Sequence, residues 1–119
     1  MRKTILVVDD DDLVRTVTVR MLRRLGYEVI ETSNAETAID AAKAHAGTIH
    51  LVLSDIVLGA GNGIEVLQTI SVVRPDAASL LMSGSGVSVA EGVRFLQKPF
   101  TYEQLRDRVF ELIGPVDAL

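Results

Sequence analysis

The chain has 119 residues, no cysteine and a formal net charge of −4, with 48% of its residues hydrophobic and 24% charged. These values exclude a disordered or collagen-like chain, a disulfide framework and a cysteine nucleophile, and they predict a single globular domain over residues 1–119. No apolar run approaches the roughly 20 residues of a membrane-spanning helix, so we expect no membrane segment and a cytoplasmic location.

The first part of the chain predicts a strand, a helix and an edge strand. Residues 5–8 are an apolar run, and Asp11 or Asp12 is placed to cap a helix that ends at Gly26. The apolar positions of this helix follow a helical period and are Val14, Val17, Met21 and Leu25. Residues 27–32 mix polar and apolar side chains, as an edge strand does.

The middle of the chain carries the segment around which we expect the fold to be built. Ser33 with Glu36 predicts a capping box ahead of an alanine-rich helix. Residues 51–55 then form an apolar run that ends on a carboxylate, which is typical of a central strand covered on both faces. The glycine-rich residues 58–63 are expected to be a flexible connection, with Asn62 as the cap of a third helix. That helix is expected to carry Ile64, Leu67 and Ile70 on one face.

The last part of the chain predicts two more strands and a final helix. Residues 80–82 are an apolar run and residues 95–97 (Phe-Leu-Gln) lead into Lys98, so each predicts a strand, and Thr101 with Gln104 predicts a capping box. The inward-facing residues expected on the final helix are Leu105, Val109 and Leu112. The segment between residues 83 and 98 opens with Gly-Ser-Gly, so the fourth helix, around residues 87–93, is expected to be short or absent. The alternation predicts an α/β fold: a doubly wound, five-stranded parallel sheet with helices on both faces.

Polar side chains follow four of the five predicted strands. They are Asp9 and Asp10, Asp55, Ser83, and Lys98. Because the carboxyl ends of parallel strands meet at one edge of a sheet, we expect these side chains to converge. Three close carboxylates cannot all stay ionised without a counter-ion, and Mg²⁺ suits a few carboxylates completed by water and a phosphate. The pattern therefore predicts a magnesium site and phosphoryl transfer.

Each feature also has an ordinary structural explanation. The acidic run 9–12 would suit the start of a helix, where the dipole favours acids. Lys98 alone resembles any exposed lysine at a strand end, although a cis bond to Pro99 would aim it into the pocket. Ser83 alone is typical of a turn. The hypothesis depends on their convergence.

Taken together, the strand-end motifs resemble the receiver domain of two-component response regulators over essentially the whole chain. The matching motifs are Val7-Val8-Asp9-Asp10, Leu53-Ser54-Asp55, Met82-Ser83-Gly84 and Lys98-Pro99-Phe100. No single motif is specific to the family. The four together are specific, because they occur in the order of the family with one motif per strand. The resemblance implies the flavodoxin-like strand order 2-1-3-4-5.

The resemblance also implies a role for each matched residue. Asp55 would accept a phosphoryl group from the phosphohistidine of a histidine kinase or histidine phosphotransfer domain, with Lys98 and Ser83 holding the phosphoryl oxygens. Ser83 and Phe95 would form a conformational switch. Mg²⁺ would be held by Asp10 and Asp55 directly, by Asp9 largely through water, and by the backbone carbonyl of Val57. Such a domain catalyses only its own phosphorylation and dephosphorylation, so we expect a signalling domain and not an enzyme.

Three features depart from the family pattern. Gly59 stands where a proline is usual, so residues 58–63 are expected to be more mobile. Val57 is apolar and cannot orient an attacking water, which predicts slow loss of the phosphoryl group. The short segment before Lys98 resembles receivers attached to hybrid sensor kinases, and it leaves open whether the chain forms the homodimer that is common in the family.

Other readings of the sequence fit less well. The glycines at 59–63 do not match the G-x-G-x-x-G of a dinucleotide site, and Asp9 with Asp11 lacks the residues that follow the nucleophile in haloacid-dehalogenase phosphatases. The acidic net charge disfavours direct nucleic-acid binding. The basic residues that cluster on the first helix are expected to be a solvated face: Arg15, Arg20, Arg23 and Arg24. A degenerate receiver that only binds partner proteins stays an alternative.

Overall fold

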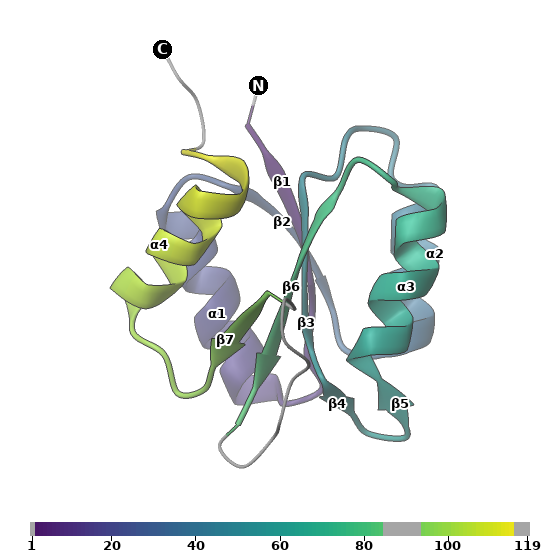
Figure 1. The fold of residues 1–119 in the computed structure, drawn as a ribbon, viewed down its shortest axis with the longest axis horizontal. Helices are drawn as coiled ribbons and strands as arrows, with labels where there is room; N and C mark the ends of the chain where they lie inside the picture. The colour runs from purple at the N-terminus through teal and green to yellow at the C-terminus, as the bar shows by residue number, and fades with distance from the viewer. Residues whose placement is uncertain (1, 85–93, 116–119) are drawn as a thin grey trace.

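The computed structural model describes residues 2–84 and 94–115. The strands of the main sheet are β1 (Thr4–Val8), β2 (Glu28–Thr32), β3 (Leu51–Asp55), β6 (Ala78–Ser83) and β7 (Phe95–Gln97). The helices in the described ranges are α1 (Asp12–Arg24), α2 (Ala35–Ala44), α3 (Gly63–Val73) and α4 (Tyr102–Ile113). All neighbouring strands are parallel and the order is β2-β1-β3-β6-β7, which confirms the predicted topology (Figure 1).

The sheet lies between two helical layers (Figure 1). The helices α1 and α4 cover one face, where Ile5 and Val7 of β1 are buried, and α2 and α3 cover the other, where Leu6 and Val8 are buried. Both faces of β1 and β3 are therefore apolar, as expected of central parallel strands. No helix in the described part of the chain is long and apolar enough to cross a membrane. The fourth helix considered around residues 87–93 lies outside the described residues.

The helix caps agree with the sequence at three of four helices. Asp11 caps α1, Asn62 caps α3, and the capping box predicted for α4 is present. The cap predicted for α2 was wrong by one residue. Asn34, not Ser33, accepts a hydrogen bond from the Thr37 amide over 2.8 Å. Asparagine is as good an N-cap as serine, so the local pattern alone does not distinguish the two.

The apolar positions predicted on two helices agree only in part with the faces that pack on the sheet. On α1 the structure buries Thr18, Val19 and Leu22. Of the predicted positions, Met21 and Leu25 are partly buried against this core, whereas Val17 is 42% exposed. On α3 the buried residues are Gly63, Val66 and Ile70. Of the predicted face, Ile70 is buried, Leu67 is partly buried against the core and Ile64 is 41% exposed. Both helices carry apolar residues on more than one side, and periodicity does not say which side meets the sheet. On α4, Leu105 and Val109 are buried as predicted.

The expected flexible connection after β3 is instead a small antiparallel hairpin. Its strands are β4 (Val57–Leu58) and β5 (Gly61–Asn62). Gly59 opens the two-residue turn with a φ of +54°, which is the glycine position of a common hairpin turn. A proline ring would lock φ near −65°. The hairpin therefore explains why this chain has glycine where a proline is usual in the family.

Candidate phosphorylation site

The carboxyl ends of β1 and β3 bring three acids together. Val8 pairs with Ser54 in the register of these strands, so Asp9 and Asp55 follow side by side. Asp9, Asp10 and Asp55 each offer an oxygen that lies within 4.8 Å of the others. Asp9 is fully buried, Asp55 half-buried and Asp10 exposed. The cluster therefore has one buried wall and one side open to solvent.

Lys98 closes the cluster from the end of β7. Its Nζ donates to Asp55 Oδ2 over 2.6 Å and to Asp9 Oδ2 over 2.9 Å. Burial disfavours the ammonium form, but the hydrogen bonds to Asp55 and Asp9 together with the negative charges of these acids outweigh it and raise the pKa of Lys98. The predicted cis bond between Lys98 and Pro99 is present. Lys98 is thus a fixed positive charge that touches the two carboxylates.

Asp9 is held in place by its neighbours. Its Oδ1 accepts a hydrogen bond from the Asp11 amide over 2.9 Å, and its own amide donates to the Thr32 carbonyl over 3.2 Å. Burial raises the pKa of the Asp9 carboxyl, and the Asp11 amide and Lys98 offset this only in part. A carboxylate buried in this way is stabilised by any further positive charge, which a divalent cation would supply.

The hairpin presents the backbone of Val57 to the site. In a hairpin with a two-residue turn, the pair flanking the turn exchanges hydrogen bonds and the next pair does not. Val57 pairs with Asn62 in that second position, so its amide and carbonyl both point away from β5. The Val57 amide donates to Asp55 Oδ1 over 3.2 Å. Its carbonyl therefore lies on the side of the acids, while its side chain is 58% exposed.

Ser83 and Phe95 lie beyond the acid cluster. Ser83 ends β6 next to β3 and is buried, and its Oγ is 3.4 Å from the Gly84 carbonyl oxygen. Phe95 is half-buried at the start of β7, where it pairs with Leu81. The next residue, Leu96, belongs to the core under α1 and α4, so Phe95 points to the other face of the sheet. The Ser83 hydroxyl makes no hydrogen bond to Asp55 in this conformation.

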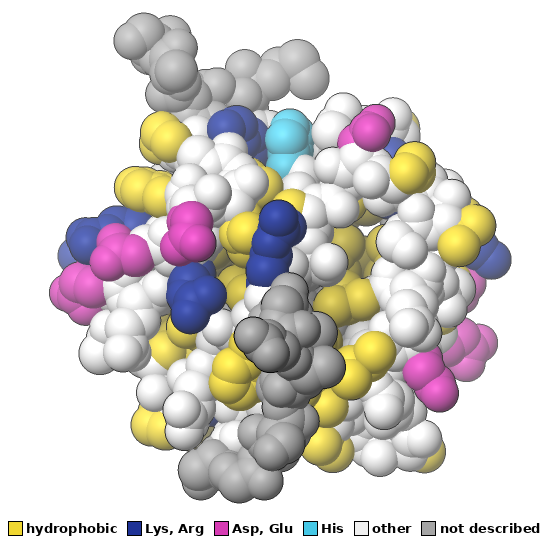
Figure 2. Space-filling view, in the orientation of Figure 1, with side chains coloured by type: hydrophobic (Ala, Val, Ile, Leu, Met, Phe, Trp, Pro, Cys, Tyr) yellow, Lys and Arg dark blue, Asp and Glu magenta, His cyan; other side chains and the backbone are white. Residues whose placement is uncertain are grey.

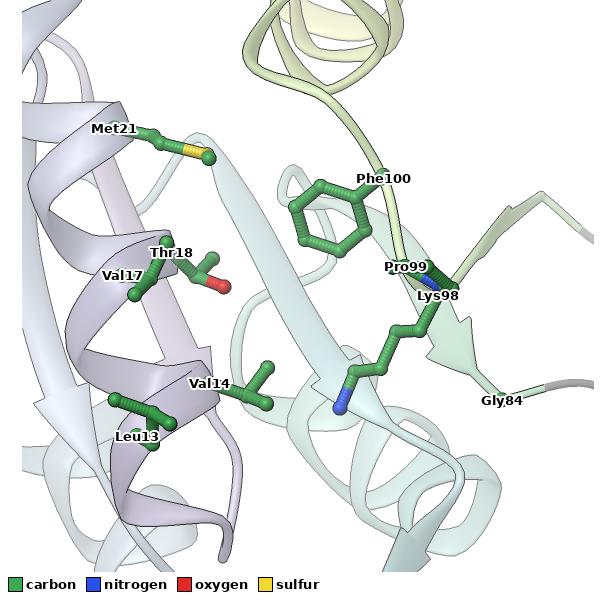
Figure 3. A pocket seen from close by; sticks show the side chains of 9 residues that line it. All are labelled: Leu13, Val14, Val17, Thr18, Met21, Gly84, Lys98, Pro99 and Phe100. Carbon is green, nitrogen blue, oxygen red and sulfur yellow. The ribbon is translucent and has the colours of Figure 1, made fainter.

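An apolar groove of about 500 Å³ opens beside Lys98. Figure 3 shows it between α1 and the segment that carries Lys98, Pro99 and Phe100, with the Phe100 ring facing α1. On the α1 side it is lined by Leu13, Val14, Val17, Thr18 and Met21. Leu13 is 74% and Val17 42% exposed, so this side of the groove presents adjoining apolar side chains to solvent.

A comparison with known protein families identifies the family of this domain. The model of the response regulator receiver domain matches residues 5–110, which include all four strand-end motifs. The chain belongs to the response regulator receiver domain family. Receiver domains are signalling domains of two-component systems, so this chain is a signalling domain of that class.

Two curated relatives illustrate where similar domains occur. The receiver domain is 37% identical over 109 residues to the DNA-binding transcriptional regulator NtrC of Azospirillum brasilense, which covers 86% of this chain and 22% of that protein. It is 30% identical over 121 residues to the sensor kinase CckA of Brucella abortus, covering 96% of this chain and 13% of that protein. The chain thus spans less than a quarter of either relative's length.

Solved structures confirm the fold. The receiver domain of the hybrid histidine kinase CckA matches with a TM-score of 0.79 and 37% identity, over 92% of this chain and 98% of that one. A response regulator of Burkholderia pseudomallei, solved with a phosphorylated aspartic acid, a calcium ion and citrate, matches with a TM-score of 0.78 and 25% identity. That match covers 93% of this chain and 66% of the other.

Sequence reasoning missed three features of this receiver domain. Gly63 packs so closely on the Asp55 carbonyl that a Cβ would overlap it, and a glycine directly after a cap residue was the available signal. The second feature is the exposed apolar side chain of Leu13 on α1. The signal in the sequence was an apolar residue that lies outside the predicted stripe. Arg15 was grouped with the other arginines of α1, although it contacts Asp9, Asp12 and Glu31.

The charge distribution offers no support for nucleic-acid binding on the face shown in Figure 2. Acidic and basic side chains are interspersed there over α4. A duplex-binding surface concentrates basic residues instead.

Proposed function

We propose that the receiver domain accepts a phosphoryl group on Asp55 from the phosphohistidine of a histidine kinase or histidine phosphotransfer domain. The observation that carries this proposal is the position of Lys98, whose Nζ bridges Asp55 Oδ2 and Asp9 Oδ2. The same ammonium group could pair with a phosphoryl oxygen on Asp55. The proposed location is the cytoplasm.

In this reaction a carboxylate oxygen of Asp55 attacks phosphorus, and an O–P bond forms as the P–N bond to the donor imidazole breaks. The electron pair of that bond returns to the imidazole nitrogen. Asp55 is oriented for attack by the Val57 amide at Oδ1 and Lys98 at Oδ2. Little covalent chemistry is left to the protein, so positioning and charge neutralisation supply the catalysis.

The acid cluster fits Mg²⁺. The oxygens of Asp9, Asp10 and Asp55 lie within 4.8 Å of one another, and the exposed side of Asp10 leaves room for water. We propose that Asp10 and Asp55 hold the ion with the Val57 carbonyl, and that Asp9 acts largely through water. When bound, the ion would neutralise the charge on the transferred phosphoryl group.

Two further roles are proposed for residues at the rim. Ser83 would move toward the phosphoryl oxygens, and the Phe95 ring would turn inward to signal the change. Val57 offers only an apolar, exposed side chain beside Asp55, so no side chain at this position would orient an attacking water. The phosphorylated state would therefore be long-lived, and we expect Val57→Asn to shorten it. A lifetime of seconds that Val57→Asn leaves unchanged would contradict this role.

The phosphodonor would dock in the groove between α1 and Phe100. Lys98 lines this groove (Figure 3), and its Nζ also donates to Asp55. A helix lying along Leu13 and Val17 would bring a phosphohistidine to the edge of the acid cluster. Burial of the exposed Leu13 would contribute roughly 2 kcal/mol to that complex.

Two measurements test the proposed function. The first is transfer of ³²P from a phosphorylated histidine kinase or histidine phosphotransfer domain to the wild type and to Asp55→Asn, with and without Mg²⁺. We expect labelling of the wild type only, and only with Mg²⁺. The second is titration with beryllofluoride and Mg²⁺, followed by NMR of the backbone amides.

The alternative, a degenerate receiver that only binds partners, predicts a different result. It would show no labelling and no beryllofluoride response near Asp55. Labelling of Asp55→Asn at the wild-type rate would show that another residue is the acceptor and would reject the role of Asp55.

A further inference from the structure

Arg15 makes contacts that none of the other arginines of α1 shares in the described part of the chain. Its Nη1 donates to the backbone carbonyl of Asp9 over 2.8 Å, its Nη2 to Asp12 Oδ1 over 2.7 Å and its Nε to Glu31 Oε2 over 3.0 Å. All three guanidinium nitrogens are therefore engaged, and the side chain is only 14% exposed. The expectation of a solvated arginine was wrong at this position.

The contact with Asp9 reaches the backbone of the acid cluster. The carbonyl of Asp9 belongs to the peptide that links it to Asp10, so the direction of that carbonyl sets the orientation of Asp10. Asp9 is also held through its side chain, whereas Asp10 is exposed. An exposed carboxylate is ordered mainly by its backbone, and Arg15 is the side chain that holds this peptide.

We propose that Arg15 is a positioning residue that holds the Asp9–Asp10 peptide so that Asp10 and Asp55 can share a divalent cation. This inference rests on the proposed function, because it assumes that the cluster binds Mg²⁺. Glu31 and Asp12 keep the guanidinium at the correct place, which connects the end of β2 to the cation site.

The electrostatic effect of Arg15 has the opposite sign from its positioning effect. A positive charge near a cation site repels the cation, so removal of that charge alone would tighten Mg²⁺ binding. Loss of the support that Arg15 gives this peptide would weaken Mg²⁺ binding, because groups that hold metal ligands in place typically contribute about tenfold to a hundredfold in affinity. The direction of the change therefore distinguishes the two effects.

The experiment measures the Mg²⁺ dissociation constant by calorimetry for the wild type, Arg15→Met, Arg15→Lys and Arg20→Met. Arg20→Met is the matched control, because Arg20 is exposed on the same helix and its loss changes the net charge equally. We expect Arg15→Met to weaken binding by about tenfold. Arg15→Lys should also weaken it, since a lysine keeps the charge but cannot make three directed hydrogen bonds. Arg20→Met should stay within about twofold of the wild type, on the tighter side, because its charge is distant and screened.

Unchanged or tighter Mg²⁺ binding by Arg15→Met would overturn the proposal. If Arg15→Met shows no cooperative urea unfolding, Arg15→Lys decides the question, and wild-type affinity in that variant would overturn the proposal. A wild type that binds no Mg²⁺ would reject the magnesium site of the proposed function, and the role of Arg15 with it. Wild-type binding with unaffected Arg15 variants would reject only the role of Arg15.

Discussion

At the scale of single residues, the site depends on one position where no side chain fits. A Cβ on Gly63 would overlap the backbone carbonyl oxygen of Asp55 and would lie 2.8 Å from the Oγ of Ser54. The Gly63 amide also donates to the Ile56 carbonyl over 2.7 Å. The start of α3 is therefore packed directly against the backbone that carries the proposed acceptor.

Gly63→Ala should consequently destabilise the domain by about 3 kcal/mol, because backbone cannot yield as a flexible side chain can. Urea unfolding measures the loss. Gly84→Ala is the matched control, since a Cβ at Gly84 meets nothing within 4 Å, and it should change stability by less than about 0.5 kcal/mol. Equal losses in the two variants would contradict the close-packing argument.

Tyr27 supplies a residue-scale prediction about pH. Its hydroxyl is buried and donates to the Gly114 carbonyl over 2.6 Å, and burial raises the pKa of Tyr27 to about 12. The unfolded value is about 10, so the folded state favours the neutral phenol. This stabilisation is complete below pH about 10 and is lost as the pH rises from there toward 12.

The wild type should lose roughly 3 kcal/mol over that pH window through Tyr27 alone. Tyr27→Phe should be less stable at pH 8, by about 1 kcal/mol for the missing hydrogen bond, but it should lose less on going to alkaline pH. Urea unfolding of both proteins at pH 8 and pH 11.5 measures the difference. If the wild type and Tyr27→Phe lost the same free energy of unfolding between pH 8 and pH 11.5, the raised pKa of Tyr27 would be contradicted.

At the scale of secondary-structure elements, α1 shows where a periodic pattern is insufficient. The helix has apolar residues on two sides, and one side packs on the sheet through Val19 and Leu22. The other side presents Leu13 and Val17 to the groove. Helical spacing identified an apolar stripe, but the contact between the helix and the sheet decides which stripe is buried.

The hairpin formed by β4 and β5 gives an element-scale prediction. Gly59 has a φ of +54°, so Gly59→Pro should disrupt the turn and destabilise the domain by about 2 kcal/mol. Gly59→Asn should cost less than about 1 kcal/mol, because asparagine tolerates positive φ. Urea unfolding measures both, and NMR of the Val57 amide reports whether its contact with Asp55 survives. A Gly59→Pro variant as stable as Gly59→Asn would contradict this turn geometry.

At the scale of the whole molecule, residues far apart in the sequence meet at one edge of the sheet. The first strand supplies Asp9, the third Asp55 and the last Lys98, and only the parallel register aligns their ends. This convergence was predictable, because each strand is an apolar run that stops at a polar residue. Because these charged side chains meet at one edge of the sheet, the free energy of unfolding of the whole domain should depend on the net charge at that edge.

Mg²⁺ at a hundred times its dissociation constant should raise the free energy of unfolding by about 3 kcal/mol. Asp10→Asn should abolish this response, and without Mg²⁺ it should be no less stable than the wild type, since it removes a like charge from the cluster. Asp40→Asn, at an exposed acid on α2, should respond as the wild type does. Urea unfolding with and without Mg²⁺ measures these effects. An equal response in Asp10→Asn would place the cation elsewhere.

The sequence by itself determined the five strands of the main sheet and the polar residues at their ends, because apolar runs and the residues that stop them are local properties, and the resemblance to receiver domains gave the strand order. Only the tertiary structure decided which side of α1 is buried, why residue 63 must be glycine, and that Arg15 holds the backbone of Asp9. These features depend on contacts between segments that lie apart in the chain. A local pattern carries no information on how closely two such segments approach, and at this site that distance sets the orientation of the proposed acceptor and ligands.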